Sequence, residues 1–170
     1  MTARRIFIFA TIFALLATAI STAAPNPKQT PGGANQVSAV SGKLGQELWN
    51  GVIRFKVVEL RDARPDEHPE SVALPNQKAL VVTAIIKNGT PGTWANLVTY
   101  TLADKDEISV DLPMHFFTPP SLTIQQAAAA RQTALVPVDK NFVPVKLIFT
   151  CTTCGPKFKA FRVTIPQPSP

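Results

Sequence analysis

Short apolar stretches with a period of two residues recur along the chain from residue 46 onward. Residues 52–60 (VIRFKVVEL) place Phe55 and Val57 on one face of an extended segment and basic side chains on the other. The alternation changes phase between Val57 and Val58, which predicts a half-buried strand with a β-bulge. The Asn-Gly pair at residues 50–51 predicts a tight turn that leads into this strand.

Further strands follow in the middle of the chain. Residues 79–86 (ALVVTAII) are apolar at almost every position, which predicts a central strand that is buried on both faces. Residues 95–102 and 108–112 flank a polar turn at residues 104–107. These two segments predict a β-hairpin, because alternating strands on either side of a short polar turn pair with each other.

The C-terminal half contains the one candidate helix. Residues 125–130 (QQAAAA) favour a short helix by their alanine content. Residues 134–138 then predict a strand with Pro137 at an edge position, because proline cannot donate a backbone hydrogen bond. Residues 143–150 and 158–165 predict two more strands.

Six to eight strands at spacings of roughly ten residues predict an all-β protein, an immunoglobulin-like antiparallel β-sandwich. No alternation of helices and strands indicates a parallel sheet. The expected core comprises Phe55, Val57, Val82, Ile86, Leu135, Leu147, Phe149, Val163 and Ile165.

The N-terminal segment has the pattern of a secretory signal. Arg4 and Arg5 precede an apolar stretch at residues 6–20, which is shorter than the roughly 20 residues of a comfortable membrane span. Ser21 and Ala23 lie at the minus-three and minus-one positions of a cleavage site. We therefore expect a cleavable signal peptide and a periplasmic or secreted protein with no stable membrane span after cleavage; the alternative is an uncleaved anchor.

The mature chain divides into three expected parts. Residues 24–44 are rich in Pro, Gly, Asn, Gln and Ser, which predicts a flexible linker between the signal peptide (residues 1–23) and the folded domain. Residues 45–166 hold the strands of the sandwich, and residues 167–170 form an expected disordered tail.

The charge of the chain argues against a nucleic-acid partner. The chain has 17 Lys and Arg residues against 11 Asp and Glu. Removal of the signal peptide leaves 15 basic residues against the same 11 acidic ones, a net charge of +4, and the remaining basic residues are scattered along the sequence. We therefore interpret them as solvated surface charge rather than as a nucleic-acid or membrane-binding cluster.

Several of these segments together resemble the telokin-like, immunoglobulin-like domain of bacterial secreted proteins. The resemblance extends over most of residues 45–166 and rests on residues 45–60, 85–88 (IIKN), 100–104 (YTLAD), 133–140 (TALVPVDK) and 145–149 (VKLIF). It implies an immunoglobulin-like fold and an extracellular setting, and it implies no catalytic site.

The two cysteines form a Cys-x-x-Cys sequence at Cys151 and Cys154. The same spacing occurs in thiol-disulfide exchange enzymes, in which a helix N-terminus stabilises the reactive thiolate. Here the pair lies between two predicted strands with no amphipathic helix after it. In an exported protein we expect an inert local disulfide; a redox site and a metal site are the alternatives.

An acidic loop is the second candidate site. Asp66, Glu67, His68 and Glu70 lie close together in sequence and could supply oxygen and imidazole ligands to a divalent cation. Pro65 and Pro69 splay these side chains, however, and the spacing is not that of a calcium loop. We interpret the segment as a solvated connecting loop, with a metal site as the alternative.

Large apolar side chains provide a third candidate. Trp94, Met114, Phe116 and Phe117 would mark a partner surface if they were exposed together, and otherwise they belong to the core or its rim. The chain has only two histidines, His68 and His115, and no G-x-S-x-G sequence, so a serine triad finds no support.

These observations predict a non-enzymatic exported domain without a cofactor, which binds an extracytoplasmic protein or an envelope component. The alternatives are a thiol-disulfide redox protein that uses Cys151 and Cys154, and a metal-binding domain that uses the acidic loop.

Overall fold

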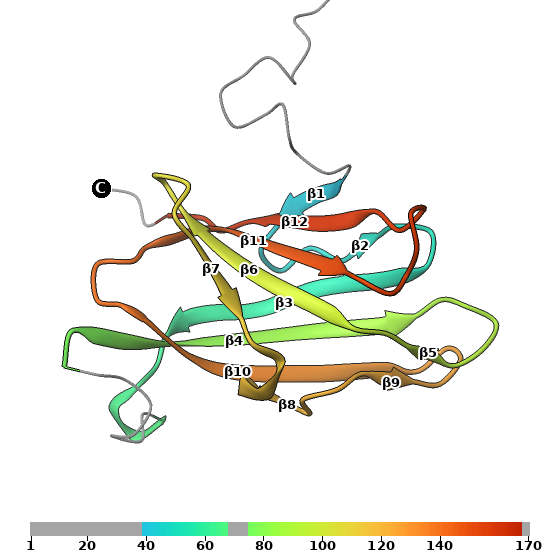
Figure 1. The fold of residues 1–170 in the computed structure, drawn as a ribbon, viewed down its shortest axis with the longest axis horizontal. Helices are drawn as coiled ribbons and strands as arrows, with labels where there is room; N and C mark the ends of the chain where they lie inside the picture. The colour runs from blue at the N-terminus through green and yellow to red at the C-terminus, as the bar shows by residue number, and fades with distance from the viewer. Residues whose placement is uncertain (1–38, 68–74, 168–170) are drawn as a thin grey trace, which may run out of the picture. The chain divides into compact units, whose positions relative to one another are not determined.

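The structure, a computed structural model, describes residues 39–67 and 75–167 (Figure 1). Its regular structure is β-strand, as the sequence patterns predict, and no α-helix occurs within the described ranges. Two short 3₁₀ turns, η2 (Pro65–Glu67) and η3 (Met114–Phe116), lie between strands. The strands are β1 (Ala39–Lys43), β2 (Leu48–Trp49), β3 (Ile53–Asp62), β4 (Gln77–Asn88), β5 (Trp94–Ala95), β6 (Val98–Asp104), β7 (Ser109–Leu112), β8 (Phe117–Thr118), β9 (Thr123–Ile124), β10 (Ala129–Asp139), β11 (Pro144–Cys151) and β12 (Ala160–Thr164).

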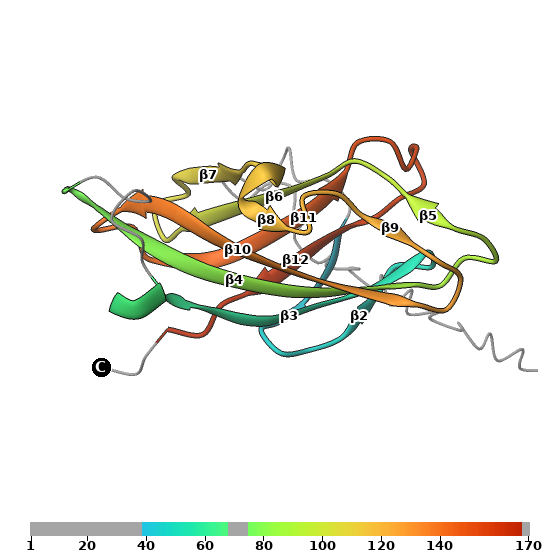
Figure 2. The ribbon, with the colours of Figure 1, turned by 90° about the horizontal axis from the view of Figure 1, so that it is seen from below.

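Two five-stranded sheets stack face to face and form a β-sandwich. The β11 sheet has the order β1-β12-β11-β6-β7, and the β4 sheet has the order β2-β3-β4-β10-β8. Figure 2 shows β4 and β10 side by side, and these two strands form the longest antiparallel pairing of the described fold. A short ladder of β5 and β9 lies at the right-hand end of the sandwich in Figure 1.

The core lies between the two sheets and is rich in aromatic rings. Phe55 of β3 contacts Phe149 and Phe161 of the β11 sheet, with ring centroids 4.5 and 5.2 Å apart. All three side chains are fully buried. Contacts of this size between rings stabilise a core beyond the burial of area alone, so these rings hold the sheets together. The other expected core residues are also buried, apart from Leu135.

Three local predictions are confirmed. The register of β3 on β4 shifts by one residue between Val57 and Glu59, which is the expected β-bulge. β4 lies in the middle of its sheet and is buried on both faces over most of its length. β6 and β7 form the expected hairpin, in which the Asp104 carboxylate accepts backbone hydrogen bonds from Asp106 and Ile108, each 2.9 Å long.

The predicted helix at residues 125–130 is wrong. Ala127 has a φ of 59° in a turn, and Ala129 and Ala130 already belong to β10, where they pair with β4. A six-residue helix has to overcome the cost of nucleation with few hydrogen bonds, whereas extension of a long antiparallel ladder adds bonds at once. Strand pairing with β4 therefore determined the conformation of Ala129 and Ala130 more strongly than their helix propensity did.

The expected core position of Leu135 is wrong as well. Ala134, Val136 and Val138 are the buried residues of β10, and Leu135 lies on the outer face and is half-buried. Because side chains alternate along a strand, a phase error of one residue moves a side chain from one face to the other. In a run of consecutive apolar residues the alternation does not reveal which face is inward.

The N-terminal boundary of the domain differs from the expectation. β1 lies within residues 24–44, which the composition assigns to a linker, yet it pairs in parallel with β12. The backbone N–H of Leu44 also donates a hydrogen bond to Thr164. Hydrogen bonds to the free edge of β12 order this polar segment without a large apolar contribution. The sandwich is therefore not purely antiparallel.

The signal peptide at residues 1–23, residues 24–38 of the linker and residues 168–170 of the tail lie outside the described residues. Within the described ranges, no helix has the length and hydrophobicity that a membrane span requires.

Candidate functional site

The disulfide turn follows β11 and is tied to the start of β6. Cys151 ends β11 and forms a disulfide with Cys154, with the two Cα atoms 5.5 Å apart, so the expected disulfide is present. The turn continues through Gly155, whose φ of 78° lies in the region that favours glycine. Cys151 pairs with Val98 across the ladder of β11 and β6. It thus closes a strand and does not begin a helix.

The two threonines inside the disulfide turn bind the segment that connects β5 with β6. The backbone N–H of Thr152 donates to the carbonyl of Leu97 at 3.0 Å. In the other direction, the N–H of Leu97 donates to the Thr153 hydroxyl oxygen at 2.9 Å. That hydroxyl donates in turn to Asn96 Oδ1 at 3.0 Å. The disulfide therefore fixes a turn whose side chains fix a neighbouring loop.

A pocket of about 370 Å³ opens beside this junction, and we call it the clamp pocket. Its walls come from the β5–β6 segment, from η3, from the segment before β9 and from the disulfide turn. The lining residues are Ala95, Asn96, Leu97, Val98, Met114, Pro120, Ser121, Leu122 and Thr153. Most of these side chains are apolar, and a few polar groups lie among them, which is the typical composition of ligand pockets in proteins.

Leu97 is the most exposed large apolar side chain of the described residues, with 67% of its surface accessible. It lies at the pocket wall, between the hydrogen bonds that its own backbone makes to Thr152 and Thr153. An exposed leucine side chain is unfavourable in free energy, because its apolar surface contacts water and gains no packing contacts in return. An exposed apolar side chain next to an apolar pocket marks a binding surface more strongly than either feature alone.

Trp94, Met114, Phe116 and Phe117 are not exposed together, so they do not form the conditional partner surface. Trp94 and Phe117 are buried in the core, and Phe117 stacks on Tyr100 with ring centroids 4.4 Å apart. Met114 lines the clamp pocket, whereas Phe116 lines a different hollow over the outer face of the β4 sheet. The four residues belong to β5, η3 and β8, which direct their side chains differently, so nearness in sequence did not bring them to one face.

The sequence patterns did not identify Leu97, Asn96 and Thr153 as site residues. One signal was present: in residues 95–102 the inward positions are Val98, Tyr100 and Leu102, so Leu97 is an apolar residue in the outward phase. An out-of-phase leucine at the end of a strand indicates either a bulge or an exposed apolar contact.

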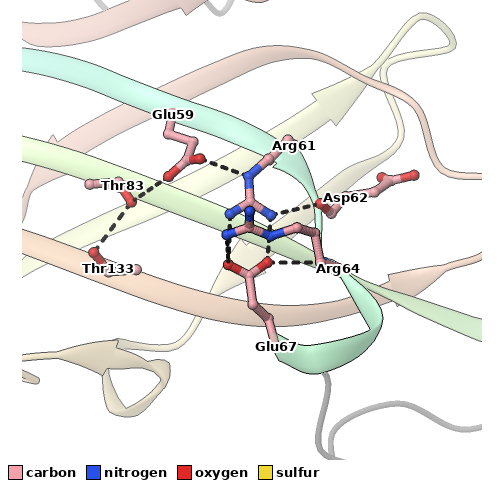
Figure 3. Close-up of polar contacts among 7 residues, drawn as sticks. All are labelled: Glu59, Arg61, Asp62, Arg64, Glu67, Thr83 and Thr133. Carbon is pink, nitrogen blue, oxygen red and sulfur yellow. Dashed lines mark hydrogen bonds and ion pairs between the residues drawn. The ribbon is translucent and has the colours of Figure 1, made fainter.

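The acidic loop has a structural role at Glu67. Arg61 donates two hydrogen bonds to the Glu67 carboxylate, at 2.6 and 2.8 Å, and Arg64 donates one at 2.9 Å (Figure 3). The backbone N–H of Arg64 adds a fourth at 3.0 Å. The hydrogen bonds from Arg61, and then those from Arg64, hold the pKa of this carboxyl far below its usual range.

Glu67 is thus occupied by two guanidinium groups, which would compete with a cation and repel it, so the structure gives no support to the alternative of Glu67 as a metal ligand. Asp66 is exposed on η2, and His68 and Glu70 lie outside the described residues. Among the residues that the structure describes, no three His, Cys, Asp or Glu side chains come together as a metal site.

The comparisons with known proteins bear on the fold. No protein-family model matches the chain, and no curated protein matches it either. The chain is similar to the solved structure of a secreted protein from Mycobacterium tuberculosis, MPT63, with 17% sequence identity and a TM-score of 0.50, over 76% of this chain and 99% of that chain. It is also similar to an uncharacterised β-sandwich protein from Clostridium difficile, with 12% identity and a TM-score of 0.47, over 76% of this chain and 95% of that one. At this identity, the likeness to the mycobacterial protein concerns the fold alone.

Proposed function

We propose that this protein is an exported, non-enzymatic binding domain, and that the clamp pocket receives an apolar side chain of an extracytoplasmic protein partner. The observation that carries the proposal is the exposed Leu97 beside a mostly apolar pocket of about 370 Å³. The energetic centre of many protein interfaces is a large apolar or aromatic anchor in such a pocket. A partner that covers Leu97 and fills the pocket would remove both from water.

The disulfide turn prepares this site for binding. Thr153 is held by the Cys151–Cys154 bridge and is hydrogen-bonded to Leu97 and Asn96 on the neighbouring segment. Hydrogen bonds therefore join two walls of the pocket before a partner binds. A wall that is already ordered does not lose conformational entropy on association, which raises the affinity for a given contact area.

The remaining support concerns the family and the destination of the protein. We propose membership of the telokin-like, immunoglobulin-like family, since residues 100–104, 133–140 and 145–149, on which that resemblance rests, lie in or beside the central strands β6, β10 and β11. Export rests on the charge and apolar pattern of the first 23 residues. The secreted mycobacterial protein of similar fold agrees with this destination.

A titration with indole, a minimal aromatic anchor, tests the pocket directly. Methyl resonances of Leu97, Met114 and Leu122 should shift together as indole is added, because all three residues line the pocket. Ser121→Trp, which fills the pocket from its own wall, should abolish the shifts. Ile108→Asp alters a similarly exposed residue (61%) that is not among the lining residues, and it should leave the shifts unchanged. Indole shifts that survive Ser121→Trp would show that the pocket is not the binding site.

A further inference from the structure

Basic residues that are scattered in the sequence come together on the outer face of the β4 sheet. Lys87 of β4 lies directly opposite Arg54 of β3. One step along the same face, Ile85 lies between Lys56 of β3 and Arg131 of β10. Phe55, Ile86 and Gln132, the neighbours of these residues along the strands, are buried, so the five residues Arg54, Lys56, Ile85, Lys87 and Arg131 point outward. We call this set, together with Trp49, the basic face.

Among the residues that the structure describes, three of the four cations on the basic face have no ion-pair partner. Arg54 has an ion pair with Glu47 at 3.3 Å. For Lys56, Lys87 and Arg131, no carboxylate within the described ranges lies at ion-pair distance. Glu59, which follows Lys56 on the outer side of β3, is bound by Arg61 at 2.7 Å.

The register places these charges where they repel one another. Lys87 is directly opposite Arg54 and diagonal to Lys56 and Arg131. Like charges at directly opposite positions of a sheet destabilise the pairing, and long side chains still interact across the diagonal. The like charges therefore oppose the pairing of these strands, and an external anion would turn this repulsion into attraction.

An exposed aromatic ring borders the charges. The guanidinium of Arg54 lies 5.0 Å from the ring centre of Trp49, and 41% of Trp49 is accessible. The far edge of the indole rests on the backbone at Gly89, where a Cβ atom would overlap the ring. Tryptophan next to lysine and arginine is typical of protein surfaces at the boundary between water and lipid headgroups.

We propose that the basic face docks onto the surface of an anionic phospholipid bilayer. The four cations extend from one side of one sheet, so a planar charged surface can reach all of them at once. Ile85 and Trp49 supply apolar contacts among these cations. This attachment is separate from the clamp pocket, since the two sets of residues have no member in common.

Vesicle co-sedimentation tests the proposal on the purified protein as isolated from cells. The vesicles contain phosphatidylcholine alone, or phosphatidylcholine with about one-third phosphatidylglycerol. The protein should bind only the anionic vesicles, and binding should weaken with added salt because exposed charges are screened. Lys87→Gln should lower the partition coefficient about fivefold, and the triple replacement of Lys56, Lys87 and Arg131 by Gln should lower it more than a hundredfold.

Lys105→Gln is the control for net charge, because it removes one exposed positive charge, paired with Asp106 at 2.6 Å, from the β6–β7 turn of the other sheet. It should bind like the unaltered protein, and all variants share the same N-terminal segment. If Lys87→Gln and Lys105→Gln lowered the partition coefficient equally, binding would depend on net charge alone. That result would overturn the proposal. Lys87-dependent binding to dextran sulfate without binding to anionic vesicles would overturn it in favour of a soluble polyanion. Thermal unfolding of Lys87→Gln at an unchanged or higher temperature shows that the variant is folded.

Discussion

The Tyr100 hydroxyl donates a 2.7 Å hydrogen bond to Gln132 Oε1 and so joins the two sheets through the core. Tyr100 belongs to β6 and Gln132 to β10, and neither side chain has accessible surface. Gln132 also donates to the carbonyl of Pro119 at 2.8 Å. A buried polar group is stable only when its hydrogen bonds are made, so this pair fixes how the sheets and the Pro119 segment lie against one another.

Tyr100→Phe should therefore destabilise the domain. The substitution keeps the ring and leaves Gln132 Oε1 buried without its donor, which costs about 1 to 3 kcal/mol in the free energy of unfolding. Urea denaturation measures this change. Thr101→Val is the matched control, since the Thr101 hydroxyl makes an exposed hydrogen bond to Asp111 and its loss should cost much less. Equal effects of the two substitutions would contradict the role of the buried pair.

Tyr100 should also resist ionisation in the folded protein. Burial raises the pKa of this phenol far above its usual range. Because the unfolded chain ionises near pH 10, the stability that depends on protonated Tyr100 is present below that pH and is lost as the pH rises above it. Tyr100 is the only tyrosine of the chain, so the near-ultraviolet absorbance of tyrosinate reports on it alone. We expect this absorbance to rise together with unfolding, and a rise in the folded state would contradict the burial.

The contribution of Glu67 should depend on pH in the opposite sense. Hydrogen bonds from Arg61 and Arg64 lower the pKa of this carboxyl in the folded state. The stabilisation is therefore present above the unfolded-state value of about 4.3 and is lost as the pH falls below it. In urea denaturation, Glu67→Gln should be less stable than the unaltered protein at neutral pH and should approach it in acid. Asp66→Asn, a change at the neighbouring exposed residue, is the control and should lower the stability at neutral pH much less. Equal losses at neutral pH would contradict the role of Glu67.

Removal of the disulfide should loosen the wall of the clamp pocket more than it destabilises the fold. The bridge closes a very short loop, so replacement of Cys151 and Cys154 by serine should lower the free energy of unfolding by about 2 kcal/mol or less. The amide hydrogen of Leu97 should exchange faster, because its acceptor is the Thr153 hydroxyl inside the turn. The amide of Ile108, which donates to Asp104 in another turn, is the control. Unchanged exchange at Leu97 would show that the bridge does not order the pocket.

The sequence revealed those features of the fold that depend on neighbours along the chain. The doubled valine after Phe55 predicted the bulge in β3, and the polar turn at Asp104 predicted the β6–β7 hairpin. Both are local, because alternation and turn chemistry act over a few residues. The alanines before Arg131 were misassigned, since their strand conformation depends on pairing with β4, which is distant in sequence.

The candidate sites were harder to predict because they depend on register. Leu97 and Thr153 are far apart in the sequence and meet only through the ladder of β11 and β6. Lys56, Lys87 and Arg131 likewise become neighbours only when β3, β4 and β10 pair in one register. A register shift of one residue would turn such side chains toward the core. The clustering of these three basic residues therefore cannot be inferred from composition. The cysteine pair was predictable, since its partners are separated by only two residues.

Capture of partners from the organism's own cell envelope tests the central claim most directly. The unaltered protein, Leu97→Asp and Ile108→Asp are immobilised in parallel, and the proteins that each form retains are compared quantitatively. Both substitutions place a carboxylate at an exposed apolar position, but only Leu97 lines the clamp pocket. We expect a protein that is retained by the unaltered domain and by Ile108→Asp and is lost with Leu97→Asp. Retention of the same proteins by all three forms would contradict a binding function of the clamp pocket.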